Sequence, residues 1–124
     1  MSNGSVLSEV GAMESPSRLL LEFASTGVVS KGELYLPVDV ARNLVGRCRE
    51  RSIVILGVEA FELLDGKILP RLDLIADFSE ALETSTVWSE TVTGTAVDAG
   101  RFLDEVERTA PALYVNFSLK AANR

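Results

Sequence analysis

The sequence has no histidine and only one cysteine, Cys48, in 124 residues. Without an imidazole, the chain cannot form the catalytic dyads, triads or metal sites that depend on histidine. A single thiol also excludes an intrachain disulfide and a thiolate zinc cluster. We therefore expect a protein of a reducing compartment.

Long apolar runs are missing as well. No stretch of the chain approaches the ~18 residues that a membrane span requires. Residues 1–15 lack the basic region and the apolar region of a secretory signal. We therefore predict a cytoplasmic protein.

The composition is typical of one folded domain. Hydrophobic residues make up 47% of the chain and charged residues 24%, which is ordinary for a globular protein. A chain of this length leaves little room for a second domain. Residues 1–14 show no sustained hydrophobic period, so we predict a flexible N-terminal tail there and a single α+β domain over residues 15–124.

The net charge of −6 comes from one segment of the chain. Residues 59–90 carry eight acidic and two basic side chains, while the remaining residues carry equal numbers of each sign. A negative chain repels phosphate backbones, so nucleic acid is a poor candidate partner. The acidic segment is therefore either solvated surface or a docking surface for a cationic partner.

Caps and hydrophobic spacing predict about three helices. Ser15 followed by Pro16 is typical of a helix start, and Gly27 suits the end of that helix. Residues 38–50 carry one apolar stripe at helical spacing. A third helix is predicted to begin at Asp98 and to end before a proline. Residues 84–95 are rich in Thr, Ser and Val and are predicted to be a β-prone segment or an ordered loop.

Strand signals occur in three places. Residues 53–56 form a continuous apolar run, as in a central strand. Asp65-Gly66 between apolar runs predicts a tight hairpin, and Pro70 confines the second arm of that hairpin to a sheet edge. Residues 113–119 alternate between apolar and polar side chains. Together these signals predict an α+β fold, with about three helices packed on a mainly antiparallel sheet of three to five strands.

Few residues are suited to catalysis or metal binding. Asp73, Asp77 and Glu80 are close enough in sequence to hold a divalent cation or to divide acid and base roles. Nothing beside them indicates a substrate pocket, and their spacing is not that of a calcium loop. Cys48 lies on the apolar stripe of residues 38–50, so we predict a buried structural thiol.

Three aromatic residues have distinct predicted places. Phe61 is predicted to lie in the core, and Tyr114 on the polar face of the last strand. Trp88 stands among acidic residues in a Ser- and Thr-rich stretch. It is predicted either to close one edge of the core or to anchor an interface.

Three stretches of the chain resemble the immunity protein 40 group. They are IVILGVEAF at residues 53–61, PRLDLIADFS at residues 70–79 and ALYVNFSLK at residues 112–120. Members of this group are small cytosolic proteins that neutralise toxins of bacterial polymorphic-toxin systems. The resemblance implies a stoichiometric inhibitor that needs no cofactor and binds a toxin domain rather than turning over a substrate.

The leading hypothesis is an immunity-type protein, not an enzyme, that binds a basic toxin domain through its acidic segment. The expected contact residues are Glu59, Glu62, Asp65, Asp73, Asp77, Glu80 and Trp88. One alternative is a small carboxylate- or metal-dependent enzyme. Another is a homo-oligomeric ligand-binding or assembly protein whose subunits associate through residues 114–118.

Overall fold

The computed structural model describes residues 15–122. The helices are α2 (Pro16–Leu21), α3 (Val38–Glu50), α4 (Ala81–Thr84) and α5 (Trp88–Thr109), with a short 3₁₀ helix η1 (Ala24–Thr26). The strands are β1 (Val28–Ser30), β2 (Glu33–Pro37), β3 (Val54–Leu64), β4 (Lys67–Asp77) and β5 (Tyr114–Lys120). The flexible tail predicted for residues 1–14 lies outside the described residues.

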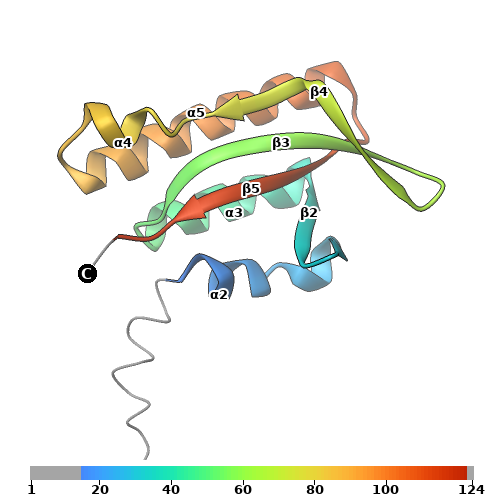
Figure 1. Cartoon of the computed structure of the whole chain (residues 1–124), viewed down its shortest axis with the longest axis horizontal. Coiled ribbons are helices and arrows are strands. Elements are labelled where there is room, and N and C mark those ends of the chain that lie inside the picture. The colour runs from blue at the N-terminus through green and yellow to red at the C-terminus, as the bar shows by residue number, and fades with distance from the viewer. Residues whose placement is uncertain (1–14, 123–124) are drawn as a thin grey trace, which may run out of the picture.

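All five strands pair antiparallel in the order β1-β2-β5-β3-β4. The two long helices, α3 and α5, run behind the strands in the view of Figure 1 and pack against each other and against the sheet. The α+β prediction is therefore confirmed, with five strands in the sheet and one more helix than the three expected.

The hydrophobic core lies between the sheet and the two long helices. In β3, Val58 and Ala60 are buried, and in β5 Val115 and Phe117 are buried. These side chains meet the apolar stripes of α3 and α5, which include Ala41, Leu44, Cys48, Ala99, Leu103 and Val106. The intervening strand residues point to the opposite side of the sheet, because successive side chains alternate between faces.

We call that opposite side the open face. It is formed by side chains that are exposed or half-buried: Tyr35, Glu59, Phe61, Ile75, Asp77, Tyr114, Asn116 and Ser118. Tyr114 lies there, as the alternation of residues 113–119 predicts. Phe61 lies there too, so the prediction of a core position for Phe61 was wrong. Its ring packs edge-on against that of Tyr35, with 5.0 Å between the ring centroids.

The β3–β4 hairpin forms where Asp65-Gly66 predicts it. Asp65 has φ 51° and Gly66 has φ 77°, the left-handed pair that a two-residue turn of this kind requires. Strand β4 is the edge strand of the sheet, as Pro70 indicated. The register shifts between Glu59 and Phe61, so residues 71–74 bulge opposite a single residue of β3.

The Thr-rich segment was predicted wrongly. Residues 88–95 belong to α5, which starts ten residues before the predicted helix start at Asp98. Thr91, Val92, Thr95 and Ala96 are buried, so they extend the apolar stripe of the helix by two turns. Packing of this stripe outweighs the modest helix propensity of Thr and Val.

Thr95 also connects α5 to the sheet. Its Oγ1 accepts a hydrogen bond from the buried backbone N–H of Ile55 (3.1 Å) and donates one to the carbonyl of Thr91 (2.9 Å). Next to Ile55, the pairing of β3 with β5 shifts register. The hydroxyl group therefore satisfies a strand amide at an irregular point of the ladder.

Candidate functional site

The acidic residues predicted as contacts lie on β3, β4 and the turns at their ends. Glu59 and Glu62 come from β3, Asp73 and Asp77 from β4, and Asp65 from the hairpin turn. All are exposed except Glu62, which is half-buried. In Figure 1 this hairpin is the long green-to-yellow arm that extends beyond the helices. These acidic side chains share one hairpin but not one face, because Glu59 and Glu62 are three residues apart on β3 and successive side chains point to opposite sides of the sheet.

Arg71 neutralises two of these carboxylates. Its guanidinium binds Asp73 in a two-pronged contact, with Nε to Oδ1 at 3.0 Å and Nη2 to Oδ2 at 2.9 Å. Its Nη1 donates to Glu62 at 3.2 Å. The hydrogen bonds from Arg71 lower the pKa of Asp73 below its ordinary value. This three-residue cluster ties the bulge of β4 to β3, and its single cation is shared between two carboxylates.

Glu59 and Asp77 form no ion pair within residues 15–122. They line a hollow of about 340 Å³ on the open face, together with Gly57, Ile75, Ser79 and Ser118. Glu59 of β3 pairs with Ile75 of β4, and two residues away on each strand Gly57 pairs with Asp77. We call Glu59, Ile75 and Asp77 the acidic triplet.

Two features of the chain shape this hollow. A Cβ at Gly57 would lie 2.7 Å from the carbonyl oxygen of Ala76, so the close approach of β3 and β4 requires glycine at this position. Asp77 accepts hydrogen bonds on Oδ1 from the backbone N–H (2.9 Å) and the hydroxyl (2.6 Å) of Ser79. Both lower the pKa of Asp77, so its side chain is charged and held in position at neutral pH.

Large apolar side chains accompany these charges along β4. Leu72 is 79% exposed and Ile75 is 49% exposed. One side of the β4 backbone also has no neighbouring strand among the described residues. An edge strand with exposed apolar side chains is a recognised template for pairing with another chain.

The basic stretch that precedes β3 is used inside the molecule. Arg42 of α3 pairs with Asp104 (2.8 Å) and Glu107 (2.9 Å) of α5. Arg47 and Arg51 both reach Glu22 at the end of α2, each at 3.0 Å. These arginines therefore connect the helices to one another.

The remaining predicted contacts occupy other positions. Asp65 lies at the hairpin tip, and Glu80 precedes α4 without making a side-chain cap. Trp88 is half-buried at the start of α5, where its Nε1 donates to the carbonyl of Ser52 at 2.8 Å. The structure thus gives Trp88 an internal bond and does not bring it beside the acidic triplet in the sheet.

The predicted metal-binding carboxylates do not converge. Asp73 is bound to Arg71, and Asp77 is bound to Ser79. In the part of the chain that the structure describes, no three His, Cys, Asp or Glu residues are placed to hold a metal ion. Cys48 is fully buried, and burial raises the pKa of its thiol to about 12, as expected for a structural thiol.

The prediction of self-association through residues 114–118 meets a topological limit. Strand β5 lies inside the sheet, with β2 on one side and β3 on the other. Both edges of β5 are therefore occupied by neighbours, and its residues are available to another molecule only through their side chains on the open face.

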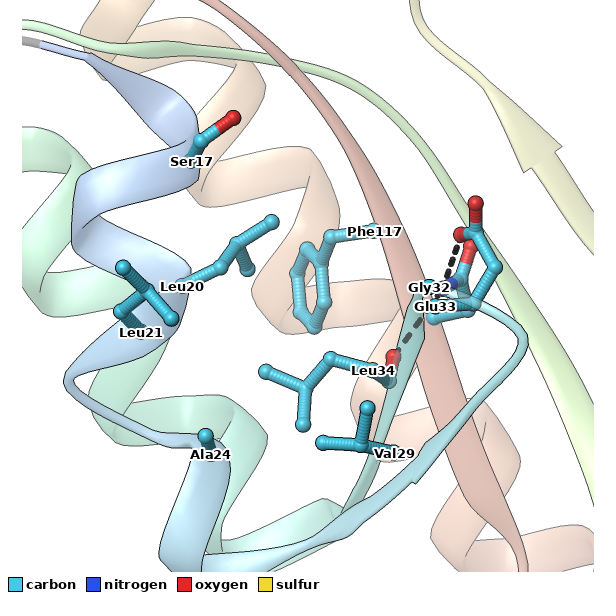
Figure 2. A pocket seen from close by; sticks show the side chains of 10 residues that line it. Ser17, Leu20, Leu21, Ala24, Val29, Gly32, Glu33, Leu34 and Phe117 are labelled. Carbon is cyan, nitrogen blue, oxygen red and sulfur yellow. Dashed lines mark hydrogen bonds between the residues drawn. The ribbon is translucent and has the colours of Figure 1, made fainter.

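A second hollow lies at the other end of the sheet, under α2. It measures about 440 Å³ and is lined mainly by apolar side chains, among them Leu20, Val29, Leu34 and Phe117. Figure 2 shows the Phe117 ring between Leu20 and Leu34, with Glu33 at the rim. No pattern in the sequence indicates this groove, because α2 and the β1–β2 hairpin, which line it together with β5, are distant from β5 along the chain.

No protein-family model, curated protein or solved structure matches the chain. Among residues 15–122, none of the helices combines the length and the apolar character needed to cross a membrane.

Proposed function

We propose that this protein is a stoichiometric binding protein that docks a basic protein partner on the acidic triplet and the adjoining edge of β4. The observation that carries the proposal is the contrast between charged side chains that form ion pairs and charged side chains that do not. Glu59 and Asp77 flank the exposed Ile75 and pair with no cation among residues 15–122, whereas Arg42 and Arg47 of α3 are bound to acidic residues of other helices.

This arrangement favours association with a cationic surface. Unpaired carboxylates on one side of a molecule attract a basic partner over distances of several ångströms and accelerate encounter. An apolar side chain between them can then be desolvated on contact, as in the centre of a protein interface. The hollow of about 340 Å³ beside these residues has room for a lysine or arginine side chain of the partner.

The biological form of this activity that we propose is toxin neutralisation. The resemblance of residues 53–61, 70–79 and 112–120 to the immunity protein 40 group supports this, and so does the unpaired acidic surface. Active sites of toxins that act on nucleic acid are basic, because they must bind phosphate. An inhibitor with free carboxylates can occupy or cover such a site.

The test compares two charge-reversed variants as baits in the native host at low salt. One carries Glu59→Lys and Asp77→Lys on the open face. The control carries Asp98→Lys and Glu105→Lys, two exposed acidic residues of α5, and therefore has the same net charge. We expect the wild type and the control to retain the same basic protein in a 1:1 complex, and the open-face variant to lose it.

Two results would contradict the proposal. One is equal recovery of the partner by both variants, because binding would then depend on overall charge or on another surface. The other is the absence of any basic partner at low salt from cells that express both proteins. Circular dichroism of the two variants establishes that each is folded before the comparison is made.

A further inference from the structure

A separate hollow of about 510 Å³ lies between the tips of the two hairpins. Its lining includes Tyr35 and Phe61, together with Lys31 from the β1–β2 turn and Lys67 from the start of β4. The volume is within the range of small-molecule sites. Among residues 15–122, no acidic side chain lines this hollow, although the chain as a whole is acidic.

The distribution of lysine makes this place unusual. The chain has three lysines, and two of them line this one hollow. Both are exposed, and neither forms an ion pair with any residue between 15 and 122. The nearest acidic neighbours in sequence are Glu33, which accepts a hydrogen bond from Asn116, and Asp65 in the hairpin turn.

The backbone at Lys31 is also atypical. Lys31 has φ 53° and the following Gly32 has φ 80°, so this turn repeats the geometry of the Asp65-Gly66 turn. Asn, Asp or Gly is the usual residue at the first of these two positions, because they tolerate the left-handed conformation best. A lysine at a position of local strain is the kind of departure that accompanies a functional role.

We propose that this hollow binds an anion of mononucleotide size that carries a planar ring. The ring lies against Tyr35 and Phe61, and the anionic group lies between Lys31 and Lys67. Aromatic side chains on a sheet surface bind ring systems by stacking. Lysine ammonium groups bind phosphate or carboxylate as point charges. Screening at physiological salt limits the opposing effect of distant acidic residues to about 8 Å.

The test is a titration of the ¹⁵N-labelled full chain, followed by amide chemical shifts. Adenosine 5′-monophosphate carries the ring and the anion, adenosine lacks the anion, and ribose 5-phosphate lacks the ring. A fourth probe, 2-naphthoate, combines a different planar ring, naphthalene, with a carboxylate. We expect saturable shifts at residues 30–35 and 61–69 with one or both of the probes that combine ring and anion, and much weaker binding of the other two. Which of the two binds shows which combination of ring and anionic group the hollow prefers.

Three variants locate the site. We expect Lys31→Ala and Lys67→Ala each to weaken binding severalfold, and Phe61→Leu to weaken it about fivefold or more through lost stacking. Lys120→Ala, which removes the third lysine, should leave the affinity unchanged. Retained thermal unfolding temperatures show that each variant is folded. Binding that is indifferent to Lys31 and Lys67, shifts confined to other regions, or no saturable binding at millimolar concentration would overturn the proposal.

Discussion

The helical side of the molecule and the β3–β4 hairpin use charge in different ways. On the helical side, Arg42 and Arg47 bind carboxylates of other helices, so charge there holds elements together. On the hairpin, Arg71 binds a carboxylate of its own strand and one of the neighbouring strand, and Glu59 and Asp77 pair with no cation in the part of the chain that the structure describes. The difference separates groups that maintain the fold from groups that remain available to another molecule.

Burial shows the same division. Leu103 of α5 is fully buried, whereas Leu72 of β4 is 79% exposed. Burial of Leu103 contributes to folding, because the side chain is removed from water when the chain folds. The exposed side chain of Leu72 is removed from water only when another molecule covers it.

Leu103→Ala should lower the free energy of unfolding by about 2–5 kcal/mol, because it opens a cavity in a closely packed core. Leu72→Ala should change it by no more than about 0.5 kcal/mol, as is usual for an exposed site. Urea denaturation of both variants measures the difference. Similar losses in the two variants would show that Leu72 is covered within the monomer, and the division would then fail.

Thr95→Val should destabilise the fold by about 1–3 kcal/mol. The substitution keeps the shape of the side chain but removes the hydroxyl group that accepts the buried N–H of Ile55, and an unsatisfied buried donor costs about that much. Thr93→Val is the matched control, because Thr93 is an exposed residue of the same helix. Equal stabilities of the two variants in thermal unfolding would contradict the role assigned to Thr95.

The smallest effects concern the titration of Asp73 and Asp77. Both pKa values lie below the ordinary value of 3.8, so each carboxylate stabilises the fold above that pH and loses this contribution as the pH falls through its own lowered pKa. Arg71→Leu should raise the pKa of Asp73 and leave that of Asp77 unchanged. Ser79→Ala should do the reverse.

Carboxyl ¹³C shifts followed between pH 2 and pH 6 resolve the two groups. This experiment separates the carboxylate that depends on a cation, Asp73, from the carboxylate that depends on hydrogen bonds from Ser79, Asp77. A rise in both pKa values in either variant would mean that the two groups share one electrostatic environment.

Local sequence signals predicted the parts of the fold that local physics determines. Asp65-Gly66 predicted the hairpin, because few residues tolerate left-handed backbone at both turn positions. The stripe of residues 38–50 predicted α3 with its observed limits. The first turns of α5 were missed, because Thr91 and Thr95 are helical only through burial against the rest of the molecule, which a propensity cannot show.

The sequence predicted which region of the chain holds the candidate site, but not how the side chains of that site are arranged. The concentration of acidic residues at 59–90 indicated the surface. That Glu59 pairs with Ile75 depends on the register of β3 and β4, which includes a bulge. The roles of Arg71 and Phe61 depend on the same register, so the sequence alone could not show which carboxylates are neutralised or which aromatic ring reaches the open face.

The most direct test of the account is the association rate of the captured partner with the wild type, the Glu59→Lys/Asp77→Lys variant and the Asp98→Lys/Glu105→Lys control at low ionic strength. Unpaired carboxylates that steer a basic partner should make the rate for the open-face variant at least about tenfold slower than the rate for the control. Added salt should reduce this difference. Equal rates for the two variants would contradict the claim that the acidic triplet is the docking surface.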